Sequence, residues 1–270
     1  MIQQKAQILA NDQVAPGVFL VEIYSPQVAS RAQPGQFLHL RVAEGPEPLL
    51  RRPMSVFRVD AEKGIVGLLF RAVGRGTRAL GQKGVGEVLD IIGPLGRGFS
   101  VLPGVRTVLA VAGGLGVAPL FFLAAVLVHR KITVRFFLGA KTKSRLLCRR
   151  RLEGLGAHLL VSTDDGSEGF HGLITQLLEE RLQQGSFQAD STLICSAGPE
   201  PMLAQVALLA CRYGLPGQIS LERQMACGVG ACWGCVVPCR AHDGHRQYRR
   251  VCIDGPVFGH QEIIFNQIYS

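Results

Sequence analysis

The stretch TVLAVAGGLGVAPL, residues 107–120, decides the fold class of this chain. A run of β-branched and small apolar residues leads into Gly113, Gly114 and Gly116, and a Leu/Ala/Phe-rich run follows. Residues 107–128 carry no charge and are long enough to span a bilayer, but the glycines and a proline interrupt them in the middle. We therefore expect a buried strand, a tight turn and a buried helix at the centre of an α/β sheet.

Strand-like and helix-like runs alternate around this stretch. Such alternation, with apolar strands, predicts a parallel sheet that is covered by helices on both faces. The expected strands are 107–112, 132–138, 158–162 and 192–196, and the expected helices are 118–130, 173–183 and 201–213.

The first hundred residues have a different pattern, because short alternating strands are separated by turn residues. About six strands without a clear helix predict a small antiparallel barrel, which closes its own edges. The strands that the pattern marks are 18–24, 37–42, 55–59, 65–71 and 87–92. The last fifty residues hold five of the eight cysteines. We expect three domains: an antiparallel β-barrel at 1–101, an α/β parallel-sheet nucleotide domain at 102–217, and a small cysteine-rich domain at 218–270.

The composition narrows the function classes. The chain has 270 residues, 47% of them apolar, and a net charge of +9 from 29 basic and 20 acidic residues. This composition argues against disorder, and the scattered basic residues favour solvated surface and ligand phosphates over a nucleic-acid footprint. The N-terminus has no signal-peptide core, so we expect a cytoplasmic protein that does not enter a membrane.

The cysteine spacing is the strongest chemical signal. C-x4-C-x2-C, followed by a fourth cysteine after a gap of sixteen residues, matches plant-type [2Fe–2S] proteins. Interleaved glycines let the backbone pass close to the cluster without a Cβ in the way. The expected ligands are Cys227, Cys232, Cys235 and Cys252.

Two alternatives to a cluster stay open. A zinc site could use Cys235 and Cys239 with His242 and His245, and disulfides are less favoured because no secretion signal is present. The remaining cysteines are expected to be structural, Cys239 as a spectator and three as small buried hydrophobic residues: Cys148, Cys195 and Cys211.

Two short motifs in the barrel suit a flavin. In RRPMS, residues 51–55, Arg52 can pair with a phosphate, Pro53 fixes the turn and Ser55 can reach the flavin ring or ribityl chain. RAVGRGT, residues 71–77, can place backbone amides around a pyrophosphate. Each motif alone is a weak signal, but they occur in order within one barrel.

Three turns of the α/β domain suit a dinucleotide. The glycines of 113–116 allow a close approach of the ligand to the backbone and to a helix N-terminus. Gly198 and Pro199 mark a later strand–helix turn at the same expected edge. Asp164, after the intervening strand, could bond ribose hydroxyls and repel a 2′-phosphate, which would favour NAD over NADP. Purely structural glycines and a simple Asp-Gly turn remain open alternatives.

The order of these motifs resembles the ferredoxin–NADP reductase superfamily: R-P-x-S at 52–55, G-x-G-T at 74–77, G-G-x-G-x-A-P-L at 113–120 and G-P-x-P-M at 198–202. The segment LERQMACGVGACWGC (221–235), closing at VCIDGPVF (251–258), is similar to the electron-transfer subunits of type B dihydroorotate dehydrogenases. The resemblance covers nearly the whole chain.

The resemblance implies FAD in the barrel and a [2Fe–2S] cluster on the four cysteines. The FAD residues that it implies are Arg52, Pro53, Met54, Ser55, Leu69, Phe70, Arg71, Gly76 and Thr77. It also implies a partner subunit with FMN that oxidises dihydroorotate, in a two-plus-two assembly, with electrons passing through the cluster and FAD to NAD+ in de novo pyrimidine (UMP) biosynthesis. No side chain of this chain is then expected to be a catalytic acid or base.

One departure and two rival functions accompany this expectation. The superfamily commonly has Cys-Gly-Pro where this chain has Ala197-Gly198-Pro199, and Cys195 is offset by roughly 6–7 Å along a strand. The efficiency of hydride transfer is therefore in question. The nearest rival is the flavin and iron–sulfur subunit of another NAD(P)H-linked complex, such as a ferredoxin:NADP oxidoreductase. A basic zinc protein that binds nucleic acid is the rival from another class.

Overall fold

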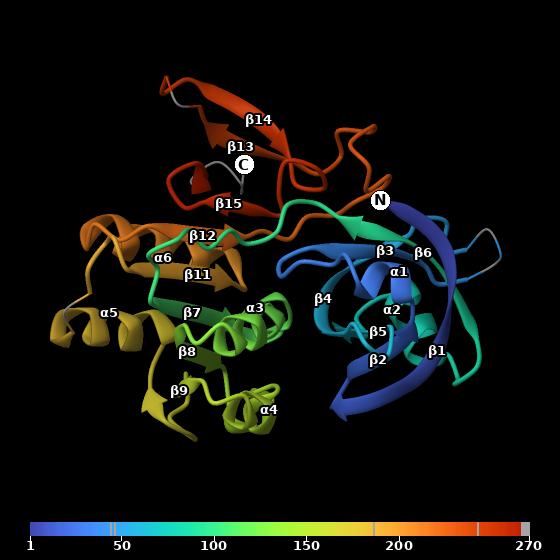
Figure 1. The fold of residues 1–270 in the computed structure, drawn as a ribbon, viewed down its shortest axis with the longest axis horizontal. Coiled ribbons are helices and arrows are strands. Elements are labelled where there is room, and N and C mark those ends of the chain that lie inside the picture. Colours follow the sequence, from blue (N-terminus) through green and yellow to red (C-terminus); the bar gives the residue numbers. More distant parts are fainter. Residues whose placement is uncertain (44, 46, 186, 242, 266–270) are drawn as a thin grey trace. The chain divides into compact units, whose positions relative to one another are not determined.

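A computed structural model describes residues 1–43, 45, 47–185, 187–241 and 243–265, and Figure 1 shows its ribbon. The chain forms two compact units. The first unit contains Met1–Gly98, Glu222–Val236 and Arg250–Pro256. The second contains Phe99–Leu221, Val237–Arg249 and the described residues after Pro256. The cysteine-rich end of the chain thus contributes to both units.

The first unit is built on a closed antiparallel barrel, as the strand pattern predicts, with the order β1-β2-β5-β4-β3-β6. Its strands are β1 (Ile2–Ala15), β2 (Val18–Tyr24), β3 (Phe37–Arg41), β4 (Arg52–Asp60), β5 (Ile65–Arg71) and β6 (Val88–Leu95). Two short helices, α1 (Pro26–Ala29) and α2 (Arg75–Gly81), lie in its connections. Sequence patterning overlooks β1, because its first half buries only Ala6 and Ile8 between polar residues.

The outer face of β3 is buried, which is unusual for a barrel strand. Successive side chains of a strand point to opposite faces, yet Phe37, Leu38, His39 and Leu40 are all buried. The cysteine-rich segments cover the outer face: a Cβ at Gly228 would lie 2.4 Å from Nδ1 of His39. The barrel and these segments therefore share one core.

The second unit has a seven-stranded sheet in the order β10-β9-β8-β7-β11-β12-β15. Its strands are β7 (Thr107–Gly113), β8 (Thr133–Ala140), β9 (His158–Thr163), β10 (Phe170–His171), β11 (Thr192–Ala197), β12 (Gly217–Ser220) and β15 (Val257–Gly259). All neighbours pair in parallel except β15, which joins β12 antiparallel at the edge. A separate two-stranded sheet consists of β13 (Val236–Arg240) and β14 (Arg246–Arg250).

Helices cover both faces of this sheet (Figure 1). They are α3 (Val117–His129), α4 (Arg149–Gly154), α5 (Ile174–Gln184) and α6 (Glu200–Arg212), with short 3-10 helices η1 (Gly114–Gly116) and η2 (Lys143–Arg145). Leu109, Val111 and Phe137 of the sheet pack in one core cluster with Leu178 of α5 and Val206 of α6. The alternate side chains of β7 point to the opposite face, so α3, which also contacts β7 and β8, covers that face.

The uncharged run of residues 107–128 forms β7, the glycine turn and α3, as predicted. In the described part of the chain no helix is both long and apolar enough to span a membrane.

Cys211 corrects one sequence expectation, because it is exposed and not a buried hydrophobic residue. The buried side of α6 is formed by residues such as Val206, Leu209 and Ala210, and the helical period of 3.6 residues turns Cys211 away from them. Cys195 on β11 is buried as expected, and Cys148 is half-buried.

Two backbone turns of the second unit touch without room for a side chain. A Cβ at Gly116 would lie 1.9 Å from the carbonyl oxygen of Ala197. A Cβ at Gly198 would lie 2.9 Å from the nitrogen of Gly113. The turn after β7 therefore packs directly on the turn after β11, and this packing requires glycine whatever ligand is bound.

We expect Gly116→Ala to destabilise the second unit by about 3 kcal/mol or more, because the added methyl group must displace backbone. Urea-induced unfolding of the full chain measures the change. Gly154→Ala is the matched control, since nothing lies within 4 Å of a Cβ there. Equal stability of the two variants would contradict the close packing of the two turns.

Candidate functional site

The four predicted cluster cysteines lie in two pairs within the first unit. The backbone N–H of Cys232 points to Sγ of Cys227 at 3.4 Å, and the N–H of Cys252 points to Sγ of Cys235 at 3.4 Å. The charges of Cys235 and Cys227 both influence the Cys252 thiol, so the two pairs are neighbours. Two pairs of sulfurs suit a cluster of two irons with four thiolate ligands.

The two cysteine pairs differ in how readily they lose protons. Partial burial raises the pKa of Cys227, but hydrogen bonds from the backbone of Val229, Cys232 and Ala231 and from the Cys232 side chain lower it overall to about 6. Burial, followed by the neighbouring Cys235 thiol, raises the pKa of Cys252 to about 12. Cys227 is therefore a thiolate at neutral pH, whereas Cys252 needs the charge of a bound metal to lose its proton.

Arg250 holds the cysteine loop in place. Its Nη1 donates to the carbonyl of Gly230 at 2.9 Å, and its guanidinium lies 4.6 Å from the centre of the Trp233 ring. Its Nε is 3.6 Å from the carboxylate of Asp254. Trp233 has a left-handed backbone with φ of 57°, which is unfavourable for a residue with a Cβ. The cation–π contact offsets part of this cost.

The structure also bears on the alternatives to a cluster. All eight cysteines are free thiols, so no disulfide is formed. In the described residues no three His, Cys, Asp or Glu side chains, those of the four predicted cluster cysteines included, lie close enough together to surround one metal ion. Cys239 and His245 form no such group there, and His242 lies outside the described residues.

The predicted flavin residues gather at one end of the β4–β5 pair. Residues 52–55 open β4 and residues 69–71 close β5, and the antiparallel register through Val56 and Leu68 runs these two segments side by side. The Arg52 side chain reaches the first turn of α2, because a Cβ at Gly76 would lie 2.6 Å from its Nε. Gly76 thus leaves the space that the guanidinium fills.

Thr77 orders the loop before α2. Its Oγ1 accepts hydrogen bonds from the N–H groups of Val73 at 2.9 Å and Gly74 at 3.0 Å. The structure therefore brings the basic side chain of Arg52 to a turn that is already fixed. A flavin phosphate fits this setting, since it needs positive charge beside a backbone that does not move.

The predicted nucleotide residues lie at the carboxyl ends of the parallel strands, where dinucleotides bind in such sheets. Gly113, Gly116 and Gly198 meet in the packed turns described above, and a Cβ at Gly113 would also lie 2.8 Å from Pro199. Asp164 lies apart, two strands or about 10 Å away, in the exposed turn after β9. The structure thus brings the glycines together but not the aspartate.

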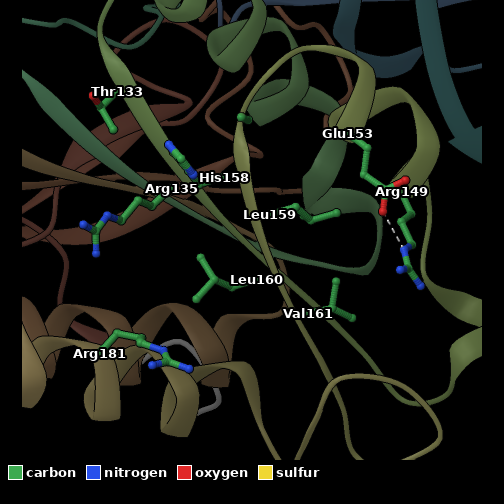
Figure 2. A pocket seen from close by; sticks show the side chains of 10 residues that line it. Thr133, Arg135, Arg149, Glu153, His158, Leu159, Leu160, Val161 and Arg181 are labelled. Carbon is green, nitrogen blue, oxygen red and sulfur yellow. Dashed lines mark hydrogen bonds and ion pairs between the residues drawn. The ribbon is translucent and has the colours of Figure 1, made fainter.

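A groove of about 710 Å³ runs along β9 (Figure 2). It is lined by β9 residues from His158 to Val161, by Arg135 of β8, by Arg149 of α4 and by Arg181 of α5. None of the predicted nucleotide residues lines this groove.

Known protein families match the chain in two places. The iron–sulfur cluster binding domain of dihydroorotate dehydrogenase B matches residues 222–264, and the oxidoreductase NAD-binding domain matches residues 110–207. The dihydroorotate dehydrogenase B (NAD(+)) electron transfer subunit of Desulforamulus reducens is 40% identical over 261 residues, 96% of this chain and 97% of that protein. This chain belongs to the family of dihydroorotate dehydrogenase B electron transfer subunits.

Another relative and two solved structures agree with this membership. The dihydroorotate dehydrogenase B electron transfer subunit of Bacillus mycoides is 37% identical over 268 residues, 98% of this chain and all (100%) of that protein. A chain of the NADH-dependent reduced ferredoxin-NADP oxidoreductase has a TM-score of 0.86 at 30% identity, covering 98% of this chain and 91% of its own. The fold is shared by a ferredoxin NADP+ reductase from Neisseria gonorrhoeae. Its TM-score is 0.67 at 19% identity, and the match covers 78% of this chain and 92% of that chain. The electron transfer subunit is thus part of an oxidoreductase with a ferredoxin reductase-like fold.

Sequence reasoning missed two residues of the cysteine centre in this electron transfer subunit. Arg250 precedes the fourth cysteine but gives no signal of its contact with Trp233, which depends on the folded loop. His39 lies on β3 with a pattern that predicts an outward, solvated side chain. Only the covering of β3 by a segment nearly 190 residues later, near Gly228, buries it.

The His39 ring is enclosed in the first unit. None of its surface is exposed, and neither ring nitrogen reaches hydrogen-bond geometry with any described residue. Burial lowers the pKa of the His39 imidazole, and the nearby backbone of Cys227 and Arg51 opposes this only in part. The ring is therefore neutral at pH 7, with one N–H donor and one acceptor nitrogen.

We expect Cys227 to be the first cysteine alkylated in the cluster-free chain. The rate with iodoacetamide should rise with pH around a midpoint near 6, because the thiolate is the nucleophile and the pKa of Cys227 is about 6. Peptide mass spectrometry after short exposures gives the site and rate. Cys252 should stay unmodified up to pH 8. A midpoint near 8.5 for Cys227 would show that the loop amides do not stabilise its thiolate.

Proposed function

We propose that this electron transfer subunit takes electrons from a dihydroorotate-oxidising partner and delivers them to NAD+ in the de novo synthesis of UMP. When bound, the [2Fe–2S] cluster carries electrons singly, and FAD collects two and passes them as a hydride to NAD+. The observation that carries the proposal is that the cysteine loop and the flavin motif belong to one compact unit and meet at β3. Family membership supplies the identity of the reaction.

The protein's own residues bind and position the redox groups, and none is needed as an acid or base on the pyrimidine. Cys227, Cys232, Cys235 and Cys252 hold the cluster, and the loop amides stabilise their sulfurs. Arg52 binds a flavin phosphate, and Ser55 faces the ring or ribityl chain. The other flavin contacts are assigned to Pro53, Met54, Leu69, Phe70, Arg71, Gly76 and Thr77.

The nicotinamide nucleotide is assigned to the carboxyl edge of the sheet in the second unit. Gly113, Gly114, Gly116, Gly198 and Pro199 form the turns along which its phosphates would pass. Asp164, which lies at the same edge, would bond the ribose and so select NAD. Ala197 fills the usual cysteine position, and the buried Cys195 does not replace it, because burial raises the pKa of its thiol and encloses it.

The partner is proposed to be an FMN-containing catalytic subunit in a two-plus-two assembly. It would approach the exposed edge of the cysteine loop, where Cys232 is exposed and Trp233 keeps 55% of its surface open. Electron transfer is favoured by a short distance between the two redox groups. An exposed ligand of the cluster therefore marks the side of the subunit at which a redox partner would bind. An interface there would also bury an aromatic side chain of the kind that anchors such contacts.

The functional division of the chain is proposed as 1–101 for FAD, 102–217 for NAD and 218–270 for the cluster. The family matches at 110–207 and 222–264 support the last two. We also propose a cytoplasmic location, since free thiols that bind a cluster suit a reducing compartment.

One rival function has a specific observation in its favour. The chain of the NADH-dependent reduced ferredoxin-NADP oxidoreductase matches 98% of this chain at a TM-score of 0.86. A subunit with that role would exchange electrons with ferredoxin and NADP, not with a dihydroorotate-oxidising partner. The higher identity to dihydroorotate dehydrogenase B subunits favours the first proposal.

We expect NAD+ reduction by dihydroorotate only when this chain, loaded with its cofactors, is combined with the FMN partner. Absorbance at 340 nm measures the rate, and ferredoxin-dependent NADP+ reduction is assayed in parallel. Cys232→Ser should abolish the coupled reaction but leave NADH-driven bleaching of the flavin, while Cys211→Ser, also an exposed cysteine, should leave both unchanged. Dihydroorotate oxidation by the isolated chain, or a reaction with ferredoxin alone, would overturn the proposal.

We expect Arg52→Ala to weaken FAD binding about thirtyfold, which corresponds to the loss of about 2 kcal/mol from one charge-assisted phosphate contact. Titration of the flavin-free chain with FAD, followed by flavin fluorescence, measures the affinity. Arg31→Ala removes the same charge from an exposed position in the same unit and should bind FAD normally. Unchanged affinity in Arg52→Ala would remove Arg52 from the flavin site.

A further inference from the structure

His39 lies on β3, a strand that touches both redox motifs of the first unit. Its backbone pairs across β3 and β4 with Pro53 of the flavin motif. Its side chain is on the outer face of β3 and lies against Gly228, the residue after the first cluster cysteine. A single residue thus links the start of the flavin strand to the cysteine loop.

The contact between His39 and the cysteine loop leaves no room for a side chain at Gly228. A Cβ at Gly228 would lie 2.4 Å from Nδ1 and 3.0 Å from Cε1 of the ring. Gly228 also has a φ of +69°, so two separate constraints exclude a side chain there. The backbone of the loop at Gly228 therefore packs directly against the imidazole.

The chemistry of the ring does not match a simple packing role. His39 is fully buried, and neither ring nitrogen has a partner in good hydrogen-bond geometry among the residues that the structure describes, although the backbone of Cys227 and Arg51 is near enough to act on the ring. A buried polar group without a partner costs about 1–3 kcal/mol, whereas leucine would fill a similar space without that cost. Cys227 directly precedes Gly228, so the sulfur of Cys227 with its cluster would supply a hydrogen-bond acceptor in the same loop.

We propose that His39 is a positioning residue for the iron–sulfur cluster, whose ring N–H donates a hydrogen bond to the Cys227 side of the cluster loop and raises the reduction potential of the cluster. This inference rests on the proposed ligation by the four cysteines. A donor at the cluster edge stabilises the reduced form more than the oxidised form, because reduction adds negative charge to the sulfurs. The same bond holds the loop against the strand that carries the flavin motif.

The test compares three variants of the full chain that is loaded with FAD and cluster. His39→Leu keeps apolar packing and removes the donor, whereas His39→Asn and His39→Gln place an amide N–H near the positions of Nδ1 and Nε2. A redox titration followed by electron paramagnetic resonance gives the midpoint potential and g values of the cluster. Flavin absorbance confirms that each barrel is folded.

We expect His39→Leu to shift the one-electron equilibrium of the cluster about tenfold toward the oxidised form, a fall of about 59 mV. One of the two amide variants should recover at least half of this shift. Loss of the cluster in His39→Leu alone, with a near-normal potential in an amide variant, would also support the proposal.

Three outcomes would overturn it. The first is a cluster potential and g values in His39→Leu that equal those of the wild-type chain. The second is loss of the cluster in all three variants, which would indicate that His39 acts only through packing. In both cases the wild-type chain still shows its [2Fe–2S] signal, so the proposed function stands. The third is a wild-type chain without that signal, which would overturn the proposed ligation as well.

Discussion

The first unit depends on one constraint: cysteine sulfurs that carry negative charge need hydrogen-bond donors around them. Backbone amides provide these donors, and they reach the sulfurs only if the loop turns tightly, which positive φ at Gly228 and Gly230 allows. A loop wound in this way has little apolar surface of its own. It is held instead by Arg250 and by the outer face of β3. The buried histidine, the strained tryptophan and the shared core all follow from this requirement.

The second unit shows how one feature can serve packing and binding together. The glycine turn after β7 is the motif that most resembles a nucleotide site, yet its glycines are already required where it touches the turn after β11. Sequence alone leaves both explanations open, and the structure shows why they are compatible. Two turns that pack without side chains leave a smooth backbone edge at the carboxyl end of the sheet, which is the surface that a dinucleotide uses in folds of this kind.

Local sequence patterns predict those structural features that depend on residues close together in the chain. The bounds of β2 and β5 agree with the expectation because short, mostly apolar runs there are preceded by turn residues, and the 107–128 run resolves into strand, turn and helix. Features that depend on distant segments could not be predicted. They include the antiparallel edge strand β15 and the burial of His39. The strand β1 is polar on its outer side, and Cys211 looks apolar but lies on the exposed side of α6. The cysteine spacing predicts a loop, and the structure pairs Cys227 with Cys232 within it, whereas the ligation of a cluster by all four cysteines stays a prediction.

The covering of the barrel by the end of the chain has a consequence for synthesis. Residues 1–98 leave the ribosome first and can close their barrel early, but the cover of β3 near His39 belongs to residues 222–236. Until residues 222–236 have been synthesised, the outer face of β3 around Phe37 and His39 is exposed to solvent. The surface of the barrel is therefore completed only after more than a hundred further residues have been synthesised, at the stage when the cysteine loop itself appears.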